Sequence, residues 1–492
     1  MKIGFDNEKY IQMQSEQILN RISQFGGKLY LEFGGKLFDD YHASRVLPGF
    51  APDSKIRMLT QLKDSAEIVI VISSNDIEKN KLRGDIGITY DQEVLRLIDA
   101  FRSRGLYVGS VAMTRFNGQA AAEAFQQHLE NLGLKVYRLH DIPDYPSSIP
   151  TIASDSGFGK NDYIETQRNL VVITAPGPGS GKMAACLSQL YHESRRGVQA
   201  GYAKFETFPI WNLPLKHPVN LAYEAATADL ADVNMIDPFH LEAYGTMAVN
   251  YNRDVEIFPV LRSIFEGVLG HCPYKSPTDM GVNMAGYCIF DDEAVNSAAR
   301  SEIIRRHYNA LVNYSQGGSS AGEVYKTELL MKQAGVTAAD RPCIAAAMKV
   351  TEEVGRPACA IELPDGRIVT GKMSDLLQPS SAMLLNALKV LGGIEDIHLL
   401  SPQVIEPVQA LKTRHLDYAN PRLQTEEVLL ALSICAANDE TARLALEQLD
   451  KLKGCDCHSS VILSQADAGV FKRLCVNLTS EPRFEGTNLY HK

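Results

Sequence analysis

Short apolar runs alternate with longer segments of helical period in the first half of the chain, and this alternation constrains the fold more than any other feature. The runs are bounded by turn residues, as expected for strands buried in a sheet. They cover Leu29–Phe33, Glu67–Ile72, Leu106–Met113, Lys135–Leu139 and Leu170–Thr174. Two helical segments, Asp91–Arg102 and Gln119–Leu132, lie between the middle runs. The pattern predicts an α/β fold with an N-terminal Rossmann-like or P-loop-like parallel sheet and helices on both faces.

The second half of the chain begins with long helical stretches and few strand-like runs. These stretches include Leu221–Leu230 and Glu293–Leu311 and predict a helical middle region. From about Arg341 onward the pattern indicates a small C-terminal α/β domain. We therefore expect an α/β phosphate- or nucleotide-binding domain over residues 1–220, a mainly helical domain over 221–335 and the C-terminal domain over 336–492.

A β-hairpin is the clearest element of the C-terminal domain. Its strands are expected at Ala358–Leu363 and Arg367–Thr370, because the Asp-Gly pair between them supplies the positive φ that tight turns need. The other elements expected in this domain are a helix over Ser380–Leu391 and strands over Ile397–Leu400 and Ser460–Leu463.

The composition is that of a folded protein and excludes several classes of partner. Hydrophobic residues make up 45% of the 492 residues and charged residues 22%, which are globular proportions. A formal net charge of -10 argues against nucleic acid, which is bound by clustered Lys and Arg. No run approaches the roughly 18 apolar residues of a membrane span, and Met1–Phe25 reads as an amphipathic helix rather than a signal peptide. We expect no membrane contact and a cytoplasmic location, where the nine cysteines stay reduced.

One strand-to-helix junction predicts an anion-binding site. The apolar run Leu170–Thr174 is followed by the glycine-rich segment Ala175–Lys182 and then by a helix through about His192. Glycines let main-chain N–H groups converge on a phosphate, and the helix adds the positive end of its dipole. The expected cofactor-binding residues are Gly177, Gly179, Ser180, Gly181 and Lys182, with ATP or another nucleotide and Mg²⁺ as candidate cofactors.

This loop departs from the known phosphate-binding motifs at several positions. The Walker A pattern would place glycine at Pro176, and the Ser or Thr that holds Mg²⁺ at Met183. The dinucleotide fingerprint would need a third glycine at Lys182. The alternative interpretation is a tight turn that requires glycine for backbone reasons alone.

A second strand-to-loop junction has a similar makeup. Gly34, Gly35 and Lys36 follow the run Leu29–Phe33, and Asp39 comes shortly after. Ligands gather at the carboxyl ends of parallel strands, so that both loops are expected to face one cleft. We expect the three loop residues to bind the cofactor and Asp39 to act as a base or metal ligand. The alternative is a solvated loop whose charges are unrelated to function.

Two polar segments of the middle region supply further candidates. Asp237 and His240 combine a carboxylate with an imidazole that titrates near neutral pH, as acid–base work requires. Lys275 and Asp279 lie in a polar turn between helices, and such turns often line sites. We expect catalytic roles for Asp237, His240 and Asp279 and a cofactor contact for Lys275. The alternative is that these residues cap helices.

Four segments together resemble a bacterial family known as the domain of unknown function, family eighteen-forty-six. The segments are Ala175–Lys182, Lys204–Asn220, Asp237–Tyr244 and Lys275–Asn283. The resemblance covers essentially the whole chain and implies a separate C-terminal domain. Members of the family have sometimes been labelled ATP-dependent peptidases, a label for which this chain offers no protease motif. The resemblance supplies no catalytic residue.

Two functions remain open at this point. The first is an enzyme that binds a nucleotide or a phosphorylated metabolite and performs phosphoryl transfer or hydrolysis, since such reactions depend mainly on positioning and charge neutralisation. The second is a ligand-sensing or assembly protein that uses the same loop without catalysis. Under either interpretation the partner is a small phosphorylated molecule, and we expect a homo-oligomer.

Overall fold

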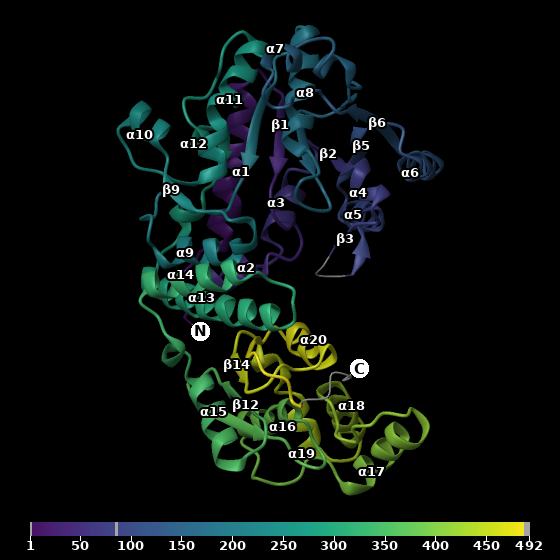
Figure 1. Ribbon diagram of the computed structural model, residues 1–492, viewed down its shortest axis with the longest axis vertical. Coiled ribbons are helices and arrows are strands. Elements are labelled where there is room, and N and C mark those ends of the chain that lie inside the picture. Colours follow the sequence, from purple (N-terminus) through teal and green to yellow (C-terminus); the bar gives the residue numbers. More distant parts are fainter. Residues whose placement is uncertain (1, 84–86, 487–492) are drawn as a thin grey trace. The chain divides into compact units, whose positions relative to one another are not determined.

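The computed structural model describes residues 2–83 and 87–486 (Figure 1). The chain divides into two compact units. One comprises Gly4–Leu215 with Asp232–Val295, and the other comprises Lys216–Ala231 with the chain from Asn296 onward and the residues before Gly4. The domain limits expected at residues 220 and 335 stay a prediction.

A parallel sheet of seven strands forms the centre of the first unit, as expected from the alternation of apolar runs and helices. The strand order is β11-β8-β1-β7-β2-β5-β6, and each neighbouring pair is parallel. The strands are β1 Leu29–Phe33, β2 Ala66–Ser73, β5 Tyr107–Phe116, β6 Lys135–His140, β7 Leu170–Thr174, β8 Gly201–Phe205 and β11 Gly281–Val282. Two short antiparallel pairs lie outside this sheet, β3 Leu82–Arg83 with β4 Ile88–Thr89 and β9 Asn234–Ile236 with β10 Val249–Tyr251.

Helices flank the sheet because the chain crosses it in two directions. From β1 it proceeds through β2 and β5 to β6, and then it returns through β7 and β8 to β11. Right-handed crossovers place the helices of these two passages on opposite faces. The return passage contributes α8 and α11, which share one buried apolar cluster with the sheet. The helices of this unit are α1 Asn7–Gln24, α2 Tyr41–Val46, α3 Ser54–Gln61, α4 Ser74–Glu78, α5 Tyr90–Arg102, α6 Ala120–Asn131, α7 Ile149–Ile152, α8 Lys182–Arg195, α10 Pro238–Tyr244, α11 Asn252–Leu269 and α12 Pro277–Met280.

The second unit combines helices with a four-stranded sheet. Its strand order is β13-β12-β14-β15, and β12 and β13 form the predicted antiparallel hairpin. The strands are β12 Ala358–Glu362, β13 Ile368–Lys372, β14 Asp456–Ser459 and β15 Asn477–Ser480. The helices that belong to it wholly or in large part are α9 Pro218–Ala226, α13 Asp292–Ser315, α14 Ala321–Ala334, α15 Pro342–Val354, α16 Pro379–Gly392, α17 Pro402–Ala410, α18 Thr425–Cys435, α19 Glu440–Leu446 and α20 Gln465–Arg473.

Two strands expected in the C-terminal domain are wrong. The segment Ile397–Leu400 is irregular, and Leu399 and Leu400 are apolar because they pack into the C-terminal core. The segment Ser460–Leu463 follows a strand rather than forming one. That strand, β14, has the sequence DCHS and lacks the apolar pattern of an ordinary buried strand. It forms because it is paired on both sides, and Cys457 and His458 are buried there.

Two expectations from composition concern membranes and cysteines. Within residues 2–83 and 87–486, no helix is both long and apolar enough to cross a membrane. All nine cysteines carry free thiols, and most of them are buried.

Candidate phosphate-binding site

The two glycine–lysine loops follow neighbouring strands of the central sheet. Strands β1 and β7 are paired in parallel, so the loops after Phe33 and Thr174 leave the same edge. From β1 the chain passes β7 to reach β2, whereas from β7 it passes β1 to reach β8. Right-handed crossovers in opposite directions leave a sheet on opposite faces, and the carboxyl ends of two such neighbouring strands are where open α/β sheets bind ligands.

The loop between β7 and α8 is a tight turn that two glycines make possible. Gly179 and Gly181 have φ of +77° and +87°, which glycine adopts without the steric cost that a side chain brings. Two hydroxyls hold the turn in place. Thr114 donates from Oγ1 to the carbonyl of Ser180 at 2.7 Å, and buried Ser180 donates from Oγ to the carbonyl of Gly177 at 3.0 Å. The turn is therefore rigid without using its own N–H groups.

These N–H groups are available to a ligand. No described residue accepts a hydrogen bond from the main-chain nitrogen of any residue from Gly179 to Met183. Gly179 is exposed and the residues that follow Ser180 are half-buried, so the turn is not sealed beneath other side chains. The first N–H groups of α8 and the positive end of its dipole thus point to a position that an anion can reach.

Lys182 is the common element of three cavities around this turn. The cavities have volumes of about 430, 570 and 600 Å³, and the side chain lines each of them. It is half-buried, and no described carboxylate forms an ion pair with its ammonium group. An anion held at the start of α8 would therefore meet a full positive charge beside the main-chain N–H groups.

The first cavity brings both predicted loops together. Gly35, Lys36 and Asp39 line it from the β1 side, and Gly177 and Lys182 line it from the β7 side. Asp39 is exposed. The sequence expectation that the two loops face one cleft is met by this geometry.

Cations outnumber carboxylates on the wall of the first cavity. The cationic side chains are Lys36, Arg83, Arg96 and Lys182, and the carboxylates are Asp39 and Glu93. Fully buried Glu93 accepts hydrogen bonds from both arginines, from Arg96 Nε at 2.7 Å. The wall therefore carries an excess of positive charge, as a phosphate site requires.

The second cavity has an apolar stretch of wall. Leu139, Ile142, Tyr145 and Phe158 form this stretch, and Lys182 lines the same cavity. Such a wall suits a flat or apolar portion of a ligand.

The third cavity contains buried charges that are not among the predicted site residues. Glu32, Lys204 and Asp254 line it together with Gly179 and Lys182. The ammonium group of Lys204 forms ion pairs with Asp254 and, at 2.9 Å, with Glu206. Glu32 is 8% exposed and accepts a hydrogen bond from the Tyr202 hydroxyl at 2.7 Å.

The electrostatics of this cluster follow from two carboxylates that share one ammonium group. Burial alone would lower the pKa of Lys204, but Asp254 and Glu206 raise it well above its ordinary value. Burial, together with the charge of Asp254, raises the pKa of Glu206 to about 7 although Lys204 opposes this shift. Burial and nearby Glu32 raise the pKa of the Tyr202 hydroxyl well above its ordinary value, so that it stays a donor. Of these perturbed groups Lys204 lines the cavity itself, and such groups are typical of functional sites.

One sequence feature could have revealed these residues. Glu32 is the fourth residue of the strand LYLEF, and Lys204 is the fourth of the strand GYAKF. A charge near the carboxyl end of an otherwise buried parallel strand is costly unless it is paired, and that end of the strand is where ligands bind.

The remaining predicted residues form a separate cluster at the starts of α10 and α12. Asp237 is fully buried and accepts hydrogen bonds from the main chain of His240 at 3.0 Å and from the hydroxyl of Thr278 at 2.7 Å. Asp279 accepts from the main-chain nitrogen of Lys275 at 2.9 Å. None of Asp237, His240, Lys275 and Asp279 lines the three cavities around Lys182.

These contacts are those of helix caps. Asp237 caps α10, and Ser276 and Asp279 form a reciprocal capping box at α12. His240 reaches Ser276 Oγ through Nδ1 at 3.1 Å, and the ammonium group of Lys275 lies over the Tyr244 ring. The carboxylates are therefore engaged by the backbone that they order.

Comparisons with known proteins match almost the whole chain. A model described as "Domain of unknown function DUF1846, N-terminal" matches residues 3–335, and its C-terminal counterpart matches residues 339–490. The UPF0371 protein cu0538 of Corynebacterium urealyticum is 58% identical over 100% of this chain and 99% of its own length. The UPF0371 protein SUB1165 of Streptococcus uberis is 55% identical over 100% of both chains. The ADP form of the Aeropyrum pernix ORC2 protein, at 10% identity, covers 87% of this chain and 84% of its own with a TM-score of 0.16, a likeness too weak for any argument.

Proposed function

The chain belongs to the family described as domain of unknown function DUF1846, and we propose that it is an enzyme that binds a phosphorylated small molecule at the Gly177–Lys182 loop and catalyses phosphoryl transfer or hydrolysis. The observation that carries the proposal is the convergence of unused main-chain N–H groups and the Lys182 ammonium group at the switch point of the sheet. Main-chain N–H groups at a helix start and a lysine are the donors that hold phosphate oxygens in proteins.

The first cavity supports the chemical step of the proposal. In hydrolysis, the oxygen of a water molecule forms a new bond to phosphorus while the bond to the ester oxygen breaks, and the alcohol and inorganic phosphate leave. Lys36, Asp39 and Lys182 line this cavity. In the proposed reaction the two lysines would neutralise the charge on the phosphoryl oxygens, and Asp39 would orient the water, accept its proton and return a proton to the leaving alcohol oxygen. In transfer, an acceptor hydroxyl takes the place of the water.

A nucleotide such as ATP and an accompanying Mg²⁺ belong to the proposal as candidates. Met183 stands where a P-loop Ser or Thr would bind Mg²⁺, and its thioether is a poor ligand for that ion. Asp39 is the carboxylate of the first cavity nearest in sequence to the β1 loop and would be the protein ligand. Dependence on Mg²⁺ is therefore part of the test.

Met183 also favours the second candidate function, a sensing or assembly protein that holds the same ligand without converting it. Without a Ser or Thr hydroxyl at this position the loop can still bind phosphate, but it lacks one Mg²⁺ ligand of P-loop catalysis. Assembly into a homo-oligomer stays a prediction under both functions, and light scattering of the purified chain measures it.

The experiment combines binding with turnover. Titration calorimetry of the full chain with inorganic phosphate, sugar phosphates and ATP, with and without Mg²⁺, measures affinity, and phosphorus NMR of the same mixtures detects a new phosphorus species. We expect Lys182→Ala to weaken every phosphate ligand by about tenfold or more, since a charge-assisted hydrogen bond contributes about 1.5–3 kcal/mol.

Lys275→Ala is the matched control, because this lysine lies outside the three cavities. Its affinities should stay within about twofold of the wild type. Binding without a new phosphorus species would favour the sensing function. Ligand affinities that Lys182→Ala leaves unchanged would overturn the assignment of the loop.

A further inference from the structure

The third cavity extends from the phosphate loop into a group of buried charges. Gly179 and Lys182 form its near wall, and Glu32, Lys204 and Asp254 form the wall beyond them. The volume of about 600 Å³ exceeds what one phosphate needs. A ligand whose phosphate rests on the loop therefore has room to place its remaining atoms against these charges.

Exposed Arg253 and Glu256 line this cavity with opposite charges, so the buried charges decide which kind of group fits there. A second phosphate would face Glu32 and Asp254, and a buried anion beside carboxylates is strongly disfavoured. An ammonium group would meet Lys204, which is held positive by Asp254 and Glu206. An uncharged group that both donates and accepts hydrogen bonds avoids both penalties.

Glu32 is the side chain best placed to bind such a group. It is more than nine-tenths buried and lines both the second and the third cavity. Its Oε2 accepts from Tyr202, and no described residue donates to its Oε1. A carboxylate oxygen that opens onto a cavity and receives no hydrogen bond from the described residues can accept one from a ligand hydroxyl.

We infer that the third cavity is a subsite for the polyhydroxylated part of a sugar phosphate or polyol phosphate, with Glu32 and Asp254 accepting from its hydroxyls and Lys204 donating to them. This inference rests on the proposed phosphate site. It names the substrate class of that site as a phosphate monoester of an uncharged polyol.

The test compares four probes by titration calorimetry on the full chain. The probes are inorganic phosphate, glucose 6-phosphate, O-phosphoethanolamine and ATP. We expect the wild type to bind glucose 6-phosphate at least about tenfold more tightly than inorganic phosphate, because hydrogen bonds between its hydroxyls and buried charged groups are stronger than bonds between neutral groups. We expect no such gain for O-phosphoethanolamine.

Two variants show which residues cause the tighter binding of glucose 6-phosphate. Glu32→Gln should reduce the preference for glucose 6-phosphate by about tenfold and leave the affinity for inorganic phosphate within about twofold. Lys182→Ala should weaken both ligands alike. Glu67→Gln is the matched control, since this glutamate is also buried, in β2, lines none of the three cavities and accepts hydrogen bonds from the main chain of Gln167 and Arg168. It should leave the preference unchanged.

Failures of the two proposals are distinguishable. A wild type that binds none of the four probes overturns the phosphate site itself. A wild type that binds phosphate but shows no preference for the sugar phosphate, or prefers the amine or ATP, overturns only the sugar subsite. That comparison needs no variant, so a Glu32→Gln protein that fails to fold leaves the inference open to refutation.

Discussion

Single residues at the carboxyl ends of the strands matter through the space that their side chains occupy and the charge that they carry. Gly177 does not have a positive φ, so backbone conformation does not require glycine there. Space does, because a Cβ atom at this position would lie 2.1 Å from the Tyr90 hydroxyl and 2.6 Å from its ring. The glycine at position 177 of the loop is therefore explained by Tyr90 of helix α5.

Gly177→Ala tests this explanation at the residue level. We expect the substitution to destabilise the protein by about 1–3 kcal/mol, since overpacking forces Tyr90 out of its position. In a Tyr90→Ala background the same substitution should cost less than about 0.5 kcal/mol. Urea unfolding of the four proteins measures the coupling. Equal costs in both backgrounds would contradict the clash.

Glu206 predicts a pH dependence of stability. Its pKa is about 7 in the folded state, against about 4.3 in the unfolded chain. Between these values the folded protein retains a proton that the unfolded chain has released, so stability falls as pH rises from about 4.5 to 7 and then levels off. The total contribution is about 4 kcal/mol, of which about 3 kcal/mol is lost above pH 5.

Urea unfolding at pH 5 and pH 7.5 checks this sign. The wild type should lose about 3 kcal/mol relative to Glu206→Gln between the two conditions, because the glutamine has no proton to release. If the two proteins change in parallel, the carboxyl group of Glu206 is not protonated at pH 5 in the folded state.

Short helices at the edge of the first unit depend on side chains that cap them. Asp237 and Asp279 lie at the starts of α10 and α12, each of which is too short to be stable alone. Polar residue types that acid–base catalysis would use are the same types that order helix starts. Because Asp237 and Asp279 accept hydrogen bonds from main-chain nitrogens, we assign them the structural role of helix caps.

Asp237→Ala should lower stability and leave ligand affinity unchanged, whereas Asp39→Ala should abolish turnover and leave stability unchanged. Asp237→Ala removes the acceptor of two buried donors on Thr278 and of the part-buried main-chain nitrogen of His240, and it should cost about 2–3 kcal/mol of stability, with phosphate affinity unchanged in the folded protein. Asp39→Ala removes an exposed side chain and should alter stability by less than about 0.5 kcal/mol while abolishing turnover. Thermal unfolding and phosphorus NMR measure the two effects. A stable Asp237→Ala protein that has lost ligand binding would refute the capping role.

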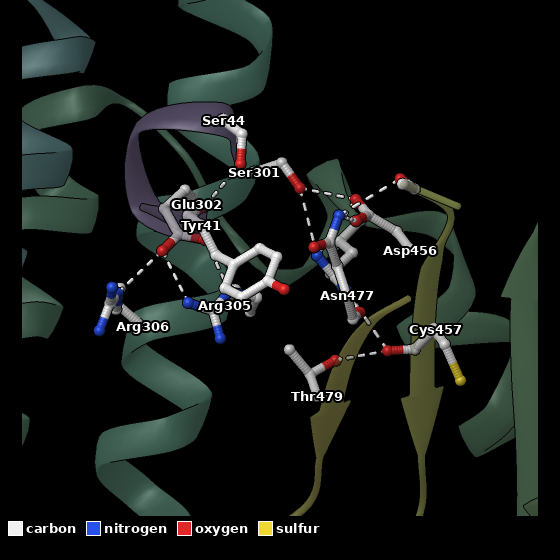
Figure 2. Close-up of polar contacts among 12 residues, drawn as sticks. Tyr41, Ser44, Ser301, Glu302, Arg305, Arg306, Asp456, Cys457, Asn477 and Thr479 are labelled. Atoms are coloured by element: carbon white, nitrogen blue, oxygen red, sulfur yellow. Dashed lines mark hydrogen bonds and ion pairs between the residues drawn. The ribbon is translucent and has the colours of Figure 1, made fainter. Parts of the chain in front are cut away.

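The molecule as a whole has a separate apolar core at its C-terminal end. Every member of that core lies between Cys359 and Leu478. Helix α13 joins this region through a polar cluster (Figure 2), in which Ser301 donates to Asp456 at 2.6 Å and Asn477 donates to the same carboxylate at 3.1 Å. Buried Arg341 completes the cluster with an ion pair to Asp456 at 3.1 Å.

A fragment over residues 336–492 should therefore fold by itself. It contains the whole C-terminal core and retains both Arg341 and Asp456. A longer fragment over residues 292–492 regains Ser301 and should be more stable by at least about 1 kcal/mol. Cooperative urea unfolding of both fragments is the measurement. A short fragment that shows no cooperative transition would move the domain limit toward the start of α13.

The central sheet and the glycine–lysine loop could be predicted from the sequence because local pattern decides them. Strands β1 and β7 form where apolar residues run without interruption, and the loop after Thr174 turns where glycines permit positive φ. Lys36, Asp39 and Lys182 lie around one cavity because β1 and β7 are paired in parallel. The general rule that ligands bind at the carboxyl ends of parallel strands predicts this arrangement.

Tertiary structure alone decided the cluster of buried charges and the strand β14. Lys204 comes near Asp254 and Glu32 because β8, α11 and β1 pack together, and sequence spacing carries no record of that contact. The strand β14 forms because β12 and β15 pair with it, although its own residues are largely polar. Local propensity acts over a few residues, whereas burial of charge and pairing of strands depend on partners that the fold brings from far along the chain.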